Sequence, residues 1–109
     1  MFDVLESILE IIRLVRPIED QVKRRDPDLA RQIRRATNGV LLNASEANQR
    51  TGGDRLYLFR SSRGSASELT DGLRAAVAWG YLADEQIAAI EPKLDRVRAI
   101  LWRLAHPKA

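Results

Sequence analysis

Four segments of this chain repeat large apolar side chains at steps of three and four residues, and only short polar breaks separate the segments. That spacing places the apolar side chains on one face of an α-helix, whereas no segment shows the alternation typical of a β-strand. Such short breaks force consecutive helices to lie side by side and antiparallel. The sequence therefore predicts an all-α fold, an antiparallel up-down-up-down four-helix bundle.

Helix-capping and helix-breaking residues set the expected boundaries. Asp26 followed by Pro27 is typical of a helix start, with Asp as the cap and Pro in the first helical position. The stretch 51–54 contains two glycines and predicts a break followed by a new helix. We expect Asp84 to cap the last helix and Pro92 to bend or restart it. The predicted helices span about 3–24, 27–50, 55–79 and 84–105.

Length and composition narrow the class of protein. A chain of 109 residues can bury its own core, so residues 1–109 are expected to form a single domain. It contains no cysteine, which excludes disulfides and thiolate metal sites and suits a reducing compartment. Asp3, Glu6 and Glu10 stand where a secretory signal would be basic and then apolar, and no apolar run is long enough to cross a membrane. We expect a cytoplasmic protein.

The chain lacks the side chains on which most catalytic and metal sites depend. Its one histidine, His106, is close to the C-terminus, so Glu46 and Glu68 have no partner for the Glu-x-x-His motifs of di-iron bundles. No cysteine nucleophile is present, and no histidine is available to activate a serine. A glycine-rich phosphate loop is also missing. The sequence predicts no enzyme, no cofactor or metal site, and no small-molecule substrate.

Positive charge is concentrated in one part of the chain. Residues 23–63 hold ten basic and four acidic side chains, a surplus of +6, so the remainder must carry −3 to give the net charge of +3. Only three of the 18 basic residues are lysines, and the arginine guanidinium binds phosphate through two parallel hydrogen bonds. Two interpretations of this surplus stay open: the arginines bind RNA or DNA, or they lie on helix faces that contact only solvent. The candidate phosphate contacts are Arg24, Arg25, Arg31, Arg34, Arg55 and Arg60.

Small and polar residues interrupt the middle of the second and third predicted helices. A glycine inside a helix costs about 1 kcal/mol relative to alanine, and a close approach of another backbone usually offsets that cost. Either the two helices pack tightly within the chain, or a second copy docks there. Charged residues at helical spacing would add an ion-paired ladder that sets the register of an assembly. The residues predicted for this assembly network are Arg35, Asn43, Glu46, Arg50, Gly64, Ser65 and Glu68.

The order and spacing of several motifs resemble the four helix bundle protein family, also called the 23S ribosomal RNA intervening-sequence protein family. The matching motifs are "QIRRA" at 32–36, "NASEA" at 43–47, Arg50, Phe59, "GSASEL" at 64–69 and "GYL" at 80–82. The resemblance covers the layout of nearly the whole chain. Ala44, Ser45 and Ala47 depart from the family's N-I-A-E-G pattern, so we expect the second helix to pack less tightly at that turn or to contact its neighbour differently.

The resemblance implies the bundle fold, a homopentamer and no known enzymatic activity. It also implies a relationship to proteins that serve as accessory factors of diversity-generating retroelements. Those relatives bind nucleic acid and a reverse transcriptase. Two functions therefore stay open. One is a homo-oligomeric nucleic-acid-binding protein, with a reverse transcriptase as a further partner. The other is a protein-interaction scaffold without a nucleic-acid role, for which the aromatic anchors would be Tyr57, Trp79, Tyr81 and Trp102.

Overall fold

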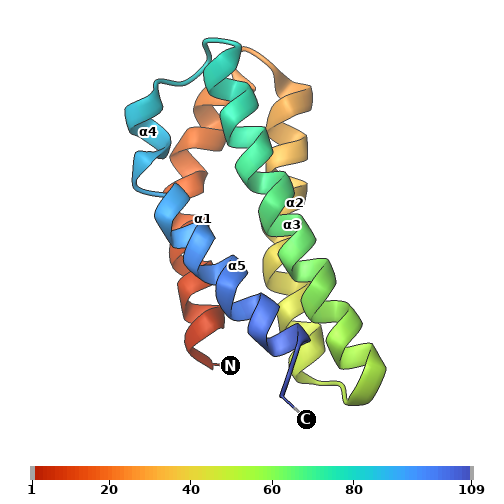
Figure 1. Ribbon diagram of the computed structural model, residues 1–109. Helices are drawn as coiled ribbons and strands as arrows, with labels where there is room; N and C mark the ends of the chain where they lie inside the picture. The colour runs from red at the N-terminus through yellow and green to blue at the C-terminus, as the bar shows by residue number, and fades with distance from the viewer. Residues whose placement is uncertain (1, 109) are drawn as a thin grey trace.

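The computed structural model describes residues 2–108, apart from the side chain of Phe2, so residues 1 and 109 of the predicted domain lie outside it. Within this range no residue lies in a β-strand. The helices are α1 (Phe2–Lys23), α2 (Pro27–Asn48), α3 (Gly52–Ala78), α4 (Asp84–Ala88) and α5 (Glu91–Ala105). Because α4 and α5 together make the fourth arm, the fold is the predicted all-α four-helix bundle (Figure 1).

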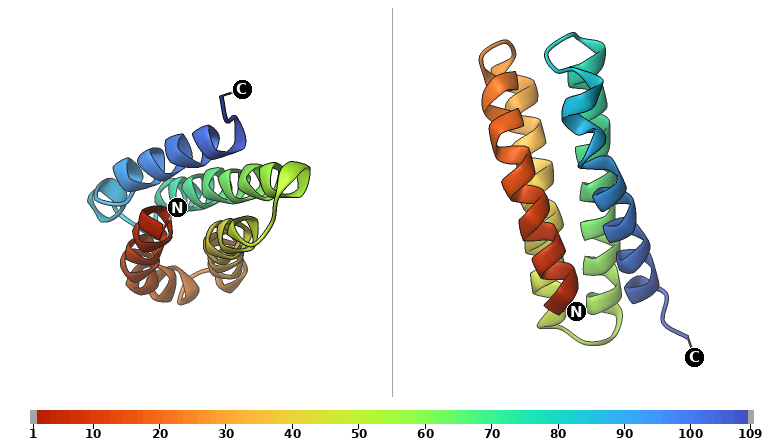
Figure 2. Two further views of the ribbon diagram at one scale, coloured as in Figure 1. Left: turned by 90° about the horizontal axis from the view of Figure 1, so that it is seen from below. Right: turned by 90° about the vertical axis from the view of Figure 1, so that its left-hand side faces the viewer.

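The arms run up and down along an elongated body that measures 46 × 22 × 20 Å. α2 packs along α3, α3 also packs against α5, and α1 packs mainly against α2. The α1–α2 pair therefore lies beside the α3–α5 pair (Figure 2). The α1–α2 turn and the α3–α4 connection share one end of the bundle, which we call the turn end. The α2–α3 loop and both chain ends lie at the opposite end, the loop end (Figure 1).

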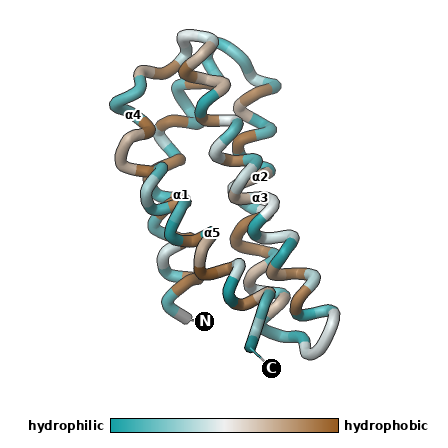
Figure 3. Tube along the Cα trace, in the orientation of Figure 1, coloured by the Kyte–Doolittle hydropathy of each residue, from teal (hydrophilic) through white to brown (hydrophobic). Residues whose placement is uncertain are grey.

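A single hydrophobic core fills the space between the arms. Apolar positions recur along each helix (Figure 3), as the sequence periodicity predicts. In α5, Leu94, Val97 and Leu101 recur at steps of three and four residues and are all buried. Phe59 of α3 is fully buried and is the largest side chain of the core. Within residues 2–108, no helix has both the length and the apolar character needed to cross a membrane.

Small residues bring α2 and α3 close together. A Cβ added at Gly39 of α2 would lie 2.5 Å from Ser65 Oγ and 3.1 Å from Ser65 Cβ on α3. Nearby, the fully buried Ser62 donates a hydrogen bond from Oγ to the carbonyl oxygen of Val40, at 2.6 Å. Tight packing within the chain thus explains Gly39 and Ser65. Gly64 differs, because a Cβ there would meet no described atom within 4 Å.

The corner between α2 and α3 is tighter than predicted. α2 ends at Asn48 rather than at 50, and α3 begins at Gly52 rather than at 55. The reason is the backbone of Gly52, whose φ of 62° is a left-handed conformation that glycine adopts without steric cost. The chain therefore reverses before Asp54, which lies inside the first turn of α3.

The fourth predicted helix is two helices. α4 begins at Asp84, so Asp84 is the first helical residue and Ala83 is the capping position, one residue earlier than predicted. α5 restarts at Glu91 with Pro92 in its first turn, where the missing N–H of proline is harmless. Ile87 and Ile90, on either side of the break, are both buried, so the two helices keep one core face.

The cap of α2 is the predicted one. Asp26 Oδ1 accepts a hydrogen bond from the backbone N–H of Leu29 at 3.0 Å, and Pro27 is the first helical residue. Asp26→Ala is expected to lower the free energy of unfolding by about 1 kcal/mol, since the N–H of Leu29 loses its acceptor. Urea denaturation followed by circular dichroism measures this loss. Asp26→Asn retains an acceptor and should lose much less; equal losses for the two variants would contradict the capping role.

Candidate nucleic-acid interface

Three consecutive basic residues, Lys23, Arg24 and Arg25, lead out of α1 into the turn before α2, and all three are exposed. The backbone N–H groups of Arg25 and Asp26 donate to the carbonyl oxygen of Val22 at 3.0 and 2.8 Å, which closes the turn. Among the ion pairs of residues 2–108, none involves these three cations. The turn end therefore holds three cations that have no carboxylate partner in the described chain.

Two aromatic residues lie at the same end, where α3 stops. Gly80 has a φ of 82° and ends the helix, as its left-handed conformation requires. The backbone N–H of Tyr81 donates to the carbonyl oxygen of Ala76 at 2.9 Å, which fixes the chain after the helix. The rings of Trp79 and Tyr81 are nearly parallel, with centroids 6.4 Å apart and an interplanar angle of 13°. Trp79 is 70% exposed.

Arg25 connects the basic turn to the aromatic pair. Its guanidinium carbon lies 5.4 Å from the centroid of the Tyr81 ring, within the range of a cation–π interaction. Gln21 of α1 donates from Nε2 to the carbonyl oxygen of Tyr81 at 3.0 Å. Partial burial raises the pKa of Tyr81, the Asp26 carboxylate adds to this rise, and Arg25 opposes it. The phenol is therefore neutral at neutral pH. We call Lys23, Arg24, Arg25, Trp79 and Tyr81 the turn-end cluster.

Arg31 and Arg34 extend the basic surface along the start of α2. Arg31 forms an ion pair with Asp28, and Arg34 Nη1 lies 3.5 Å from Glu19 Oε1 on α1. Both guanidinium groups are nonetheless exposed, and with Lys23 they line a shallow hollow of about 280 Å³ between α1 and α2. The Arg31–Asp28 pair is exposed on both sides and contributes only about 0–1 kcal/mol, whereas the Glu19 side chain of the second pair is only 14% exposed. Most of each arginine side chain, 74% for Arg31 and 69% for Arg34, is open to solvent.

The remaining two predicted phosphate contacts lie at the loop end, near the start of α3 (Figure 1). Arg55 Nη1 donates to the carbonyl oxygen of Ala47 at 3.3 Å, and its guanidinium carbon lies 4.9 Å from the centroid of the Phe59 ring. Arg55 therefore covers the C-terminal end of α2. Arg60 is exposed. The six predicted arginines do not form one surface: four lie at or near the turn end and two at the loop end.

The residues of the predicted polar network do not form one connected set of contacts. Arg50 follows the end of α2, and its Nη2 lies 2.6 Å from Oε1 of Glu46 in that helix; hydrogen bonding to Glu46 raises the pKa of Arg50. Both side chains are about half exposed. Asn43 Nδ2 donates to the carbonyl oxygen of Gly39 at 2.9 Å, within α2. These residues therefore make local contacts, and the expected buried ladder from α2 to α3 is not formed by them.

Two residues of the predicted network, Arg35 of α2 and Glu68 of α3, lie beside the same hollow on the surface. They line a shallow hollow between α2 and α3, but both are exposed, and no ion pair of the described residues joins them. The physical reason is that small, uncharged residues form the contact itself, where Gly39 faces Ser65 and Ser62 bonds to the backbone of Val40. Charged side chains are left at its margins. A role of the network in assembly stays a prediction.

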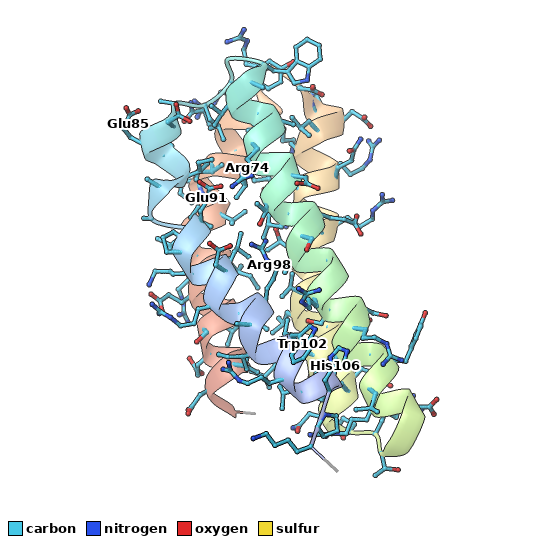
Figure 4. All side chains as sticks on the ribbon, viewed as in Figure 1. Arg74, Glu85, Glu91, Arg98, Trp102 and His106 are labelled. Atoms are coloured by element: carbon cyan, nitrogen blue, oxygen red, sulfur yellow. The ribbon has the colours of Figure 1, made fainter. Side chains whose placement is uncertain are left out.

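Sequence reasoning missed a polar contact between α3 and α5. Arg98 of α5 (labelled in Figure 4) donates from Nη1 to Thr70 Oγ1 at 2.7 Å. Thr70 Oγ1 in turn donates to the carbonyl oxygen of Ala66 at 3.2 Å. It also missed that Arg25 and Tyr81 meet, because no local pattern links residues on separate turns. Within residues 2–108, no group of three or more His, Asp or Glu side chains is placed to hold a metal ion.

The fold and these surfaces define a small antiparallel four-helix bundle with exposed basic residues at both ends. The chain belongs to the 23S rRNA-intervening sequence protein family, whose sequence model matches residues 3–103. It is also similar to a solved protein with unknown function from the S23 ribosomal protein family of Bacteroides thetaiotaomicron. The TM-score is 0.83 at 19% sequence identity, over 95% of this chain and 99% of that chain, which shows the shared fold. None of the curated proteins compared with this chain matches it.

Proposed function

We propose that this protein binds RNA or DNA through arginine–phosphate contacts, without catalysis, as a homo-oligomer. The observation that carries the proposal is the exposed run of Lys23, Arg24 and Arg25, which has no carboxylate partner among residues 2–108. Arg31 and Arg34 continue this basic surface along α2. Because phosphates are spaced regularly along a nucleic-acid strand, a row of exposed cations can neutralise several of them at once.

Assembly would strengthen this binding. Glu19 and Asp28 lie among the arginines and weaken the positive field of a single copy. Each chain carries a net charge of +3, and several linked copies would add their fields and bind one strand with avidity. The family resemblance suggests a homopentamer. It also suggests an accessory role, in which the assembly holds nucleic acid beside a reverse transcriptase.

The proposal predicts a steep salt dependence. Fluorescence anisotropy with a labelled RNA or DNA strand should show an affinity that falls as salt is raised. Arg24→Ala/Arg25→Ala is expected to weaken binding at least 10-fold at low salt, because two phosphate contacts are lost. The slope of log affinity against log salt should fall by roughly 1.4, about 0.7 for each contact with a single strand.

The matched control removes the same charge elsewhere. Arg13→Ala/Arg96→Ala deletes two exposed arginines of α1 and α5 that both lie near Glu10. This variant should lose far less affinity than Arg24→Ala/Arg25→Ala. An affinity that barely changes between low and high salt would overturn the proposal. Light scattering tests the assembly separately, since a pentamer has five times the 12.3 kDa mass of one chain.

A protein-interaction scaffold is the second candidate. Large apolar side chains are exposed on three helices, with Leu42 64%, Tyr57 63% and Trp102 47% exposed. Aromatic residues are common anchors in protein interfaces. Purification of the native protein with one stoichiometric protein partner and no nucleic acid would favour the scaffold over the nucleic-acid-binding protein.

A further inference from the structure

We infer that the turn-end cluster stacks unpaired bases, so that the protein prefers single-stranded over duplex nucleic acid. The inference rests on the proposed function, which supplies the phosphate contacts, and adds a second kind of contact to the bases. In this arrangement Trp79 and Tyr81 contact the bases, and Lys23, Arg24 and Arg25 contact the phosphates of the same strand.

The exposure of Trp79 is the first observation. A large apolar side chain that is 70% exposed forgoes most of the stabilisation that its burial would give. The backbone that carries it is nevertheless well held. The N–H of Trp79 donates to the carbonyl oxygen of Ala75 and that of Gly80 to Val77, both at 2.9 Å, and Leu82 is buried just beyond. The indole is thus presented by a fixed backbone, which lowers the entropic cost of binding.

The composition of the site is the second observation. The exposed ring of Trp79 offers a π face, and the half-buried ring of Tyr81 lies nearly parallel to it, with the guanidinium of Arg25 over the Tyr81 ring. Proteins that bind single strands without sequence preference combine aromatic stacking platforms with cations that follow the phosphate backbone. Here Lys23 and Arg24 immediately precede Arg25, so both components occur within one corner of the bundle.

Geometry favours a single strand over a duplex or a protein. In a duplex the neighbouring bases cover each base face, so flat rings at the turn end would add little to phosphate binding. A stable protein interface buries about 800 Å² on each partner, far more apolar surface than two rings provide. An exposed base needs only one ring face, and the neighbouring cations complement its phosphate. The neutral phenol of Tyr81 adds no repulsion.

The chain offers a direct spectroscopic test because it has two tryptophans. Trp102 lies on α5 and stacks on His106 with centroids 4.1 Å apart, at the loop end (Figure 4). Trp102→Phe leaves Trp79 as the only indole, and titration with oligo(dT) or oligo(U) should quench its fluorescence. Trp79→Phe leaves Trp102, whose fluorescence should stay nearly constant. Quenching of Trp102 alone would place the bases at the wrong end and overturn the inference.

Affinity provides the second readout. Trp79→Ala is expected to weaken binding of the single strand about 10-fold, within the roughly 5- to 150-fold that stacking of one base contributes. Its affinity for a duplex of the same length should not change, and Trp102→Ala should change neither affinity. Circular dichroism checks that the helices remain intact.

The outcomes separate the two proposals. If Arg24→Ala/Arg25→Ala weakens binding while Trp79→Ala does not, and Trp79 is not quenched, then base stacking is wrong and phosphate binding stands. If neither single strand nor duplex binds to the unmodified protein at low salt, the proposed function itself fails. Equal losses of duplex and single-strand affinity in Trp79→Ala would also overturn the preference for unpaired bases.

Discussion

Phe59→Ala is expected to lower the free energy of unfolding by about 3–5 kcal/mol, a large part of the roughly 5–15 kcal/mol that stabilises a small domain. Phe59 is fully buried and is the largest side chain of the core, so alanine leaves a cavity that rigid helices refill only in part. The variant also removes the ring beneath Arg55, whose guanidinium carbon lies 4.9 Å from the ring centroid. The α2–α3 corner should therefore loosen as well.

Tyr57→Ala is the matched control for Phe59→Ala. It removes an aromatic ring from the same helix, but Tyr57 is 63% exposed, so the expected change is within about 0.5 kcal/mol. Urea denaturation monitored by circular dichroism measures both variants. If both variants lost a similar free energy of unfolding, Phe59 would contribute no more to the core than an exposed ring does.

Gly39→Leu is expected to lower the free energy of unfolding by about 1–3 kcal/mol or more, because α2 and α3 must move apart to admit it. The Cβ alone would lie 2.5 Å from Ser65 Oγ and 3.1 Å from Ser65 Cβ. The serine hydroxyl can rotate, but the backbone of α3 behind it cannot yield without disturbing the neighbouring hydrogen bond from Ser62 to Val40. Thermal denaturation is a suitable measurement.

Gly64→Leu provides the contrasting variant in the facing helix. A Cβ at Gly64 would meet no described atom within 4 Å, and replacing glycine in a helix stabilises it by up to about 1 kcal/mol. The two glycine variants should therefore change stability in opposite directions. A loss of stability in both would contradict the packing argument. If Gly64 contributes to assembly as predicted, Gly64→Leu should also change the mass measured by light scattering.

Much of the bundle could be predicted because helix formation depends on neighbours along the chain. Apolar spacing predicted the four arms, and Asp26 and Pro27 predicted the start of α2. Pro92 predicted a bend or a restart of the last helix, and α5 restarts there. The errors are local. α3 begins before its predicted start because Gly52 reverses the chain early, a conformation that the sequence permits but does not require.

The candidate site was harder to predict than the fold. Composition indicated an arginine-rich surface, but the helical pattern could not show which arginines share an end of the bundle. Arg24, Arg25, Arg31 and Arg34 lie at or near the turn end, whereas Arg55 covers the end of α2 at the loop end. Within residues 2–108, no ion pair joins α2 to α3, so a role of the charged network in assembly stays a prediction. Small and uncharged residues such as Gly39, Ser62 and Ser65 occupy the helix contact, where charged side chains would lose their hydration.

The sequence by itself determined the helical class, the number of arms, a single core and a surplus of arginine in 23–63, because these properties follow from spacing and composition. Only the tertiary structure decided that Gly39 faces Ser65 and that Arg25 reaches Tyr81. Contacts of this kind depend on the rotation and crossing of packed helices. Those are set by the fit of many side chains together, which no short stretch of the chain contains.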